Sequence, residues 1–176
     1  MPDLRDRVEQ ERGLLKRIQL HVPGFAGYRR KEDVRTADNM LRIQMANMLK
    51  EVRRSVEDAR GSLAENYALE VMDKIGGLIS GFQTIEGKVR HAEGGYSGIS
   101  AAIRIQEDEL NHLYEYDTSL LDACVNMDKE AKSLRDAASG SNGLPEKVTN
   151  LRNMIRDFED NFKARMNAIT RTDVIR

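Results

Sequence analysis

The sequence predicts an all-α protein folded as an elongated helical bundle or coiled coil, and three observations support that fold class. The chain holds 3 prolines in 176 residues, so long segments lack the residue that most strongly breaks helices. Tryptophan is absent and aromatic residues make up 5% of the chain, a composition unlike that of β-sandwiches. Apolar residues recur every three or four positions, as in an amphipathic helix. We expect one domain over residues 1–176.

The first helix is expected over residues 3–22. Its apolar side chains step by three, four or seven positions: Leu4, Val8, Leu15, Ile18 and Val22. The helix is expected to end at Pro23 and Gly24, because proline disfavours helical geometry in the residue before it and glycine relaxes the backbone after it.

A second and much longer helix is expected over about residues 32–75. From Leu41 to Ile75 each step between apolar positions is three or four, and no proline intervenes. The mean step is 34/9, or about 3.8 residues, which is longer than the 3.5 of a strict heptad. A stripe of that period drifts around the helix, so we expect several neighbouring helices and not a single partner.

Residues 76–98 form a glycine-rich segment, expected to be a weakened helix to about His91 and then a turn. The segment holds 7 of the 13 glycines of the chain. Each glycine inside a helix costs about 1 kcal/mol relative to alanine. The glycines predict either a close approach between helices or a hinge.

A third helix is expected over about residues 98–138. Its apolar positions step four and three without a break from Ile99 to Ala138, which is the seam of a coiled coil. We expect it to lie antiparallel to the helix over 32–75. Pro145 then opens a fourth helix, over about residues 146–170. The two shorter helices are expected to cover the long pair.

Two polar residues, Gln106 and Asp117, occupy positions of that seam. A buried polar group has to find a partner, since its burial is otherwise costly. Such residues commonly set the register or the oligomeric state of a bundle. The alternative is that they contact a ligand or an ion inside the bundle.

No catalytic site and no cofactor are expected. The nearest pattern to a metal site is Glu109 followed by His112, but di-iron bundles need this pair on each of two helices, and it occurs here once. Both residues lie beside the apolar seam, so we expect a solvated flank and no metal. Cys124 lies on the seam, where a cysteine behaves as a small apolar residue.

The segment between the first two helices combines aromatic and basic residues, and it is the candidate binding surface: Phe25, Tyr28, Arg29, Arg30 and Lys31. These residues could insert at an anionic membrane surface or hold phosphate groups. Alternatively, Phe25 and Tyr28 plug the end of the bundle while the cations face water. About three net charges are too few for strong binding to nucleic acid, which is not expected.

The same segment resembles a prokaryotic group of small helical proteins of uncharacterised function. The residues that carry the resemblance are a turn and the start of the following helix: Pro23, Gly24, Phe25, Gly27, Tyr28, Lys31, Glu32, Ala37, Asp38, Leu41 and Arg42. Phe25 and Thr36 depart from that pattern, which has Tyr and Glu at these positions. The resemblance implies a module of turn plus helix, and no chemistry.

Charge is distributed unevenly along the chain. Residues 1–31 hold 8 Lys or Arg against 4 Asp or Glu, residues 98–138 hold 4 against 9, and residues 139–176 hold 7 against 5. This pattern predicts that basic and acidic helices pack against one another. The alternative is a basic N-terminal arm that binds an anionic partner.

We expect a cytoplasmic, non-enzymatic interaction or scaffold protein that binds a protein partner or itself. Cys124 is the only cysteine, which fits a reducing compartment, and the charged start resembles no signal peptide. No uncharged apolar run approaches the ~20 residues of a membrane span. The alternatives are a peripheral binder of membranes or anionic surfaces, and a ligand or metal carrier.

Overall fold

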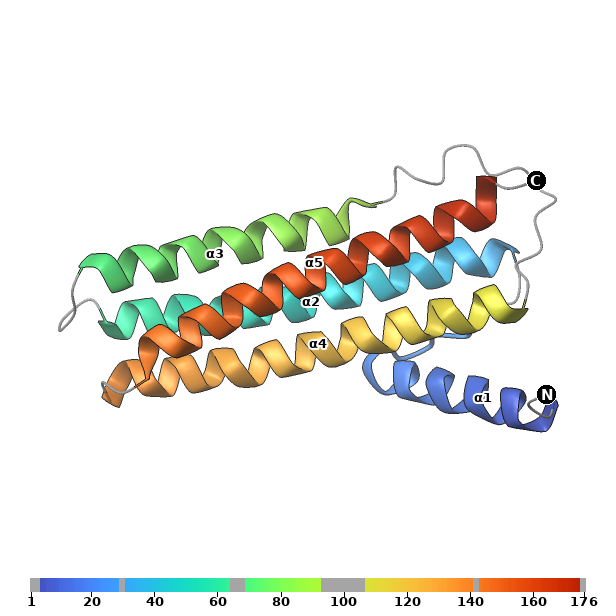
Figure 1. The fold of residues 1–176 in the computed structure, drawn as a ribbon, viewed down its shortest axis with the longest axis horizontal. Helices are drawn as coiled ribbons and strands as arrows, with labels where there is room; N and C mark the ends of the chain where they lie inside the picture. Colours follow the sequence, from blue (N-terminus) through green and yellow to red (C-terminus); the bar gives the residue numbers. More distant parts are fainter. Residues whose placement is uncertain (1–3, 29–30, 64–68, 93–106, 141–142, 175–176) are drawn as a thin grey trace.

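A computed structural model describes residues 4–28, 31–63, 69–92, 107–140 and 143–174 (Figure 1). Within these ranges the chain forms five helices and no strand. The helices are α1 (Leu4–His21), α2 (Lys31–Leu63), α3 (Leu69–Arg90), α4 (Glu107–Gly140) and α5 (Leu144–Val174). The predicted all-α class is therefore confirmed, and the bounds of α1 and α5 lie close to those expected.

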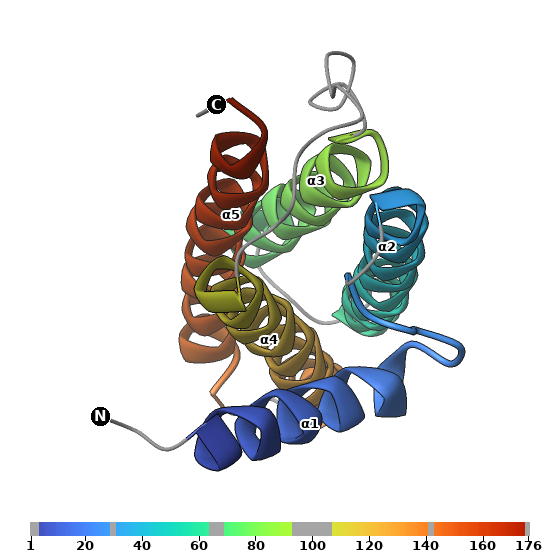
Figure 2. The same cartoon turned by 90° about the vertical axis from the view of Figure 1, so that its right-hand side faces the viewer.

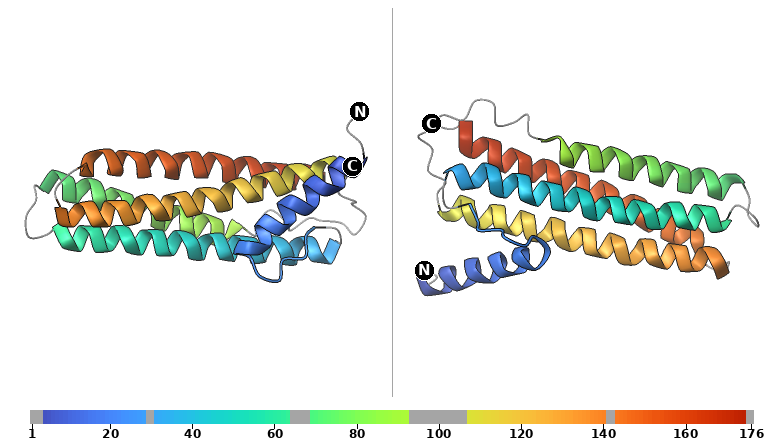
Figure 3. Two further views of the ribbon diagram at one scale, coloured as in Figure 1. Left: turned by 90° about the horizontal axis from the view of Figure 1, so that it is seen from below. Right: turned by 180° about the vertical axis from the view of Figure 1, so that it is seen from behind.

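Helices α2, α3, α4 and α5 form a closed four-helix ring. Helix α2 packs against α3 and α4, and α5 packs against the same two helices, so α2 and α5 lie across a diagonal. Helix α1 lies outside the ring, where it packs mainly against α4 (Figures 2 and 3). In Figure 1 the chain runs towards one end of the bundle in α2 and α4, and back in α3 and α5.

The predicted single helix over residues 32–75 is wrong, since α2 ends at Leu63 and a separate helix, α3, begins at Leu69. The two helices lie antiparallel. Arg53 of α2 pairs with Glu86 of α3, and Asn47, which comes earlier in α2, bonds to Arg90, which comes later in α3. The sequence hid this reversal because the helices on both sides of it point apolar residues into one core. The three-four spacing therefore continues through the change of direction.

The predicted antiparallel pairing of the helices over 32–75 and 98–138 is also wrong. Helices α2 and α4 lie side by side and run in the same direction (Figure 1), so the antiparallel neighbour of α2 is α3. Within the segment 76–98, residues up to Arg90 continue α3 as a regular helix despite four glycines. The predicted turn beyond Ala92 and the start of the third predicted helix, up to residue 106, lie outside the described residues.

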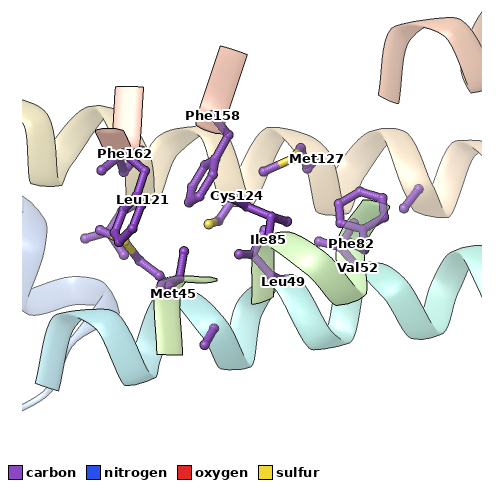
Figure 4. Close-up of a cluster of buried hydrophobic side chains, with 14 of the residues drawn as sticks. Met45, Leu49, Val52, Phe82, Ile85, Leu121, Cys124, Met127, Phe158 and Phe162 are labelled. Carbon is purple, nitrogen blue, oxygen red and sulfur yellow. The ribbon is translucent and has the colours of Figure 1, made fainter. Parts of the chain in front are cut away.

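The core fills the centre of the ring (Figure 4). It combines side chains of all four ring helices, among them Met45, Leu49, Val52, Phe82, Ile85, Leu121, Cys124, Met127, Phe158 and Phe162. Along α4 every expected seam position from Leu110 to Ala138 is buried. Among the described helices, none combines the length and apolarity needed to cross a membrane.

Candidate functional site

Five polar side chains meet inside the bundle, and together they form what we call the charge cluster. Asp38 and Arg42 come from α2, Asp117 from α4, Arg165 from α5, and Tyr28 from the turn between α1 and α2. The exposed fraction of each of these residues is 2% or less. Buried charges are rare in proteins unless they are paired, so this is the most unusual chemistry in the described chain.

Arg165 is the centre of the charge cluster. Its Nε donates to Asp117 Oδ1 at 2.6 Å, and its Nη1 donates to Asp38 Oδ1 at 2.7 Å. Its Nη2 donates to the hydroxyl oxygen of Tyr28 at 3.1 Å. The planar guanidinium has donors on three sides, which lets one residue of α5 tie together α2, α4 and the turn.

The other members complete the network. The Tyr28 hydroxyl donates to Asp117 Oδ2 at 2.5 Å, so both oxygens of that carboxylate accept hydrogen bonds. Arg42 Nε donates to Asp38 Oδ2 at 2.7 Å, and Arg42 Nη1 donates to the carbonyl oxygen of Arg90 at 3.1 Å. The last turn of α3 is thereby joined to the cluster. All four ring helices and the turn are held by one set of bonds.

The charges of the cluster balance, with two carboxylates and two guanidiniums. Burial opposes the ionisation of Asp38, but Arg165 and Arg42 outweigh it and hold the pKa of Asp38 below its usual value. Burial raises the pKa of Asp117, although Arg165 and the Tyr28 hydroxyl favour its charged form. Burial and the nearby Asp117 raise the pKa of Tyr28 well above its usual value, which keeps the phenol a hydrogen-bond donor.

The turn that delivers Tyr28 depends on two glycines. Gly24 and Gly27 have φ values of 84° and 90°, a region that residues with a Cβ rarely adopt. A Cβ on Gly27 would also lie 2.4 Å from the hydroxyl oxygen of Tyr114. That hydroxyl instead accepts a hydrogen bond from the backbone N–H of Tyr28 at 3.2 Å. The close approach of the turn to α4 therefore requires glycine at position 27.

Phe25 and Tyr28 are packed into the bundle and do not form the predicted binding surface. Their exposed fractions are 1% and 2%, and both rings make edge or tilted contacts with the ring of Tyr114. Burial of large aromatic rings is favourable, so these two side chains pack into the bundle. That part of the alternative interpretation agrees with the structure. Arg29 and Arg30 lie outside the described residues, and the side chain of Lys31 is not described either.

Asp117 is buried on the seam of α4, as the sequence predicted, and its partners are Arg165 and Tyr28. Gln106 lies outside the described residues. Sequence reasoning missed Asp38, Arg42 and Arg165 as cluster members. The spacing of α5 held a signal for Arg165. It lies three residues after Phe162 and four before Ile169, which is the spacing of a buried helix face.

Gly27, Tyr28, Asp38 and Arg42, four of the residues that carry the family resemblance, lie in or against the charge cluster. The turn supplies the phenol, and α2 supplies the carboxylate of Asp38 and the guanidinium of Arg42. Arg165 of α5 bonds to both Tyr28 and Asp38 and so links the turn to α2.

Among the described residues, His112 is not gathered with two further metal ligands. The side chain of His112 is 73% exposed, and its Nδ1 lies 3.4 Å from Glu115 Oε2. The side chain of Glu109 is not described. No group of three His, Cys, Asp or Glu that could hold a metal ion occurs among the described residues. Cys124 is buried in the core, and burial raises the pKa of its thiol.

A groove of about 490 Å³ lies between α1 and α4. It is lined by Leu14, Arg17, Glu115, Thr118, Ser119, Asp122, Ala123 and Asn126. Arg17 Nη2 pairs with Asp122 Oδ2 at 2.6 Å across it. The α4 wall carries two carboxylates, Glu115 and Asp122, within a stretch from Glu107 to Asp128 that holds seven Asp or Glu and no Lys or Arg. The predicted packing of a basic helix against an acidic one is thus present between α1 and α4.

Comparison with protein-family models, with curated proteins and with solved structures finds no match to this chain. The function is therefore inferred from the side chains of this protein alone.

Proposed function

We propose that this chain is a non-enzymatic helical interaction protein that binds a basic, amphipathic segment of a protein partner on the α4 wall of the groove between α1 and α4. The ring of α2–α5 is the scaffold, and the charge cluster holds its helices in register. The observation that carries the proposal is the groove itself, which joins apolar side chains to an acidic wall.

The charge cluster supports a structural role for the buried charges. Both oxygens of Asp38 and both oxygens of Asp117 accept hydrogen bonds from within the chain. The side chains of Arg165, Asp38 and Asp117 have no exposed surface, so a substrate has no route to them in this conformation. Buried polar networks of this kind can specify which helices pair and in which register.

The groove has the chemistry to contact one side of a partner helix. On the α4 wall Ala123 supplies apolar contact, and the carboxylate of Glu115, whose side chain is 63% exposed, lies at the rim. A Lys or Arg of the partner would meet Glu115, and its apolar residues would lie against Ala123. Charge complementarity of this type chiefly sets specificity and association rate.

Two further features belong to this proposal. Burial of every described seam position of α4 supports coiled-coil packing of α4 against its neighbours. The single thiol, kept in the core, supports a cytoplasmic location. An anionic membrane surface is less well supported as the partner, because Phe25 and Tyr28 are buried in the bundle, where neither ring can insert into a membrane.

The test compares two matched positions in the native cell. Asn126 lines the groove, and Gln83 is an exposed residue of α3, which lies diagonally opposite α4 in the ring. A photo-crosslinking amino acid at position 126 is expected to capture a protein partner through a basic amphipathic helix, and the same residue at position 83 is expected to capture none. With the crosslinking residue at position 126, Glu115→Arg should abolish the capture, whereas Gln83→Arg should leave it unchanged.

The outcomes separate the possible partners. Adducts with a second copy of this chain at position 126 would identify self-association, which light scattering of the purified protein then measures. Equal capture at both positions, or none, would contradict the proposed groove. Co-sedimentation with anionic phosphatidylserine vesicles at low salt, together with no capture at position 126, would favour the membrane surface instead.

A further inference from the structure

The segment 4–28, which comprises α1 and the following turn, lies against a ring that is already closed. Each ring helix packs against two others without any contribution from α1 (Figure 2). We call residues 4–28 the strap. The contact of α1 with the ring is mostly with one helix, α4, so fewer interactions hold α1 than hold each ring helix.

The strap is fastened mainly at its C-terminal end. Ile18, Phe25 and Tyr28 are buried there, whereas Val8 in the first half of α1 is 38% exposed. The Tyr28 hydroxyl is the only strap group bonded to the charge cluster among the described residues, through Asp117 and Arg165. Tyr28 therefore acts as a clasp at the point where the strap meets the ring.

Opening the clasp leaves no buried charge without a counter-charge. Without Tyr28, Arg165 still bonds to Asp117 and to Asp38, and Asp38 still bonds to Arg42. The two carboxylates and two guanidiniums remain balanced within the ring. The cost that normally prevents a buried ion cluster from being uncovered, an unpaired charge, is thus absent when the strap lifts.

We propose that the strap opens as one unit from an intact four-helix ring, and that in its closed state it autoinhibits the acidic face of α4. Arg17 of the strap forms an ion pair with Asp122 on that face. Leu14 of the strap lies at the apolar part of the same face. A basic partner segment would need the same carboxylate. The strap is therefore an intramolecular competitor for the partner, and this second part of the inference rests on the proposed function.

Hydrogen exchange of the full-length protein tests the opening. An isolated helix of 18 residues is marginal in water, so the amides of α1 exchange whenever the strap is open. We expect peptides from α1 to exchange faster than peptides from α3. Tyr28→Phe keeps the ring but removes the bond to a carboxylate, a change worth roughly tenfold to a hundredfold in an equilibrium constant. We expect exchange of α1 to rise by about that factor while exchange of α3 stays unchanged.

The matched control is Tyr116→Phe, which makes the same chemical change on α4 outside the charge cluster and should leave the exchange of α1 as it is in the wild type. If α1 and α3 exchange at one common rate in the wild type, or if Tyr28→Phe accelerates both together, the strap does not open as a unit and the inference is overturned. Circular dichroism confirms that each variant remains folded.

Crosslinking separates this inference from the proposed function. We expect Tyr28→Phe and Arg17→Gln each to increase capture of the partner at position 126, since each weakens the competitor. Selective exchange of α1 without any capture would leave the opening intact and overturn the autoinhibition. Capture that the two substitutions do not increase would likewise overturn the autoinhibition while leaving the proposed function in place.

Discussion

Replacing Arg165 with methionine should destabilise the fold severely. Methionine preserves much of the side-chain length, but it removes the donors to Asp117 Oδ1, Asp38 Oδ1 and Tyr28. The cluster then carries two carboxylates against one guanidinium. Asp38 keeps its bond to Arg42, but Asp117 is left in the core with the Tyr28 hydroxyl as its remaining partner in the cluster.

The expected size of this effect follows from the burial of the pair. Removing one partner of a fully buried ion pair typically costs about 3–5 kcal/mol, and Arg165 and both its carboxylate partners have no exposed side-chain surface. Domains are stable by only about 5–15 kcal/mol in total. For a chain of 176 residues, such a loss lowers the unfolding temperature by roughly 6–20 °C.

Urea unfolding at neutral pH, followed by circular dichroism, measures the change in the free energy of unfolding. Arg152→Met, on the exposed side of the same helix, is the control and should change this free energy by less than about 0.5 kcal/mol. In the double variant Arg165→Met with Asp117→Asn, part of the lost stability should return, because the unpaired carboxylate is gone.

A loss below about 1 kcal/mol for Arg165→Met would refute this reasoning, since it would mean that the cluster is solvated or rearranges freely. Strictly additive effects in the double variant would refute the coupling between Arg165 and Asp117.

The remaining predictions concern the pH dependence of stability and the effect of glycine substitutions in the turn and in α1. The lowered pKa of Asp38 contributes stability that is lost as the pH falls below about 4, so Asp38→Asn should show a shallower loss of stability than the wild type between about pH 6 and pH 3. The raised pKa of Asp117 acts in the opposite sense, because its contribution is present at low pH and lost as the pH rises through the folded-state pKa; Asp117→Asn should therefore show a steeper loss on acidification. Urea titrations over this pH range check both slopes, and two parallel profiles would contradict the assignment. Gly27→Ala should cost about 1–3 kcal/mol from backbone strain alone, whereas Gly13→Ala, whose added Cβ would meet no atom within 4 Å, should stabilise α1 by up to about 1 kcal/mol; thermal unfolding of the two variants compares them, and equal shifts would refute the role of the turn.

The seam of α4 illustrates what could be predicted with success. Its four-three spacing assigned a buried face from Leu110 to Ala138, and the polar residue on it, Asp117, was recognised as one that needs a partner. The partner could not be identified from the sequence. Arg165 lies 48 residues away on another helix, and its neighbour Met166 fits an apolar stripe equally well by spacing. Only packing decides which of the two side chains points inward.

The reversal between Leu63 and Leu69 illustrates the opposite case. Apolar spacing reports the angle of each side chain around its own helix axis, and two helices that share a core carry the same spacing. The pattern therefore does not report a reversal of the chain direction. For this reason the prediction joined α2 to the start of α3 as one helix. The parallel arrangement of α2 and α4 was missed for the same reason.

The sequence by itself determined that this protein is helical, where most of its helices end, and which face of each is apolar. These properties depend on residues within a few positions of one another, so local spacing and proline positions are sufficient to establish them. The tertiary structure alone decided the order of helices around the ring, the burial of Phe25 and Tyr28, and the joining of Asp38, Asp117 and Arg165. Charges distant along the chain become partners only when packing removes the water between them, and no local pattern records that event.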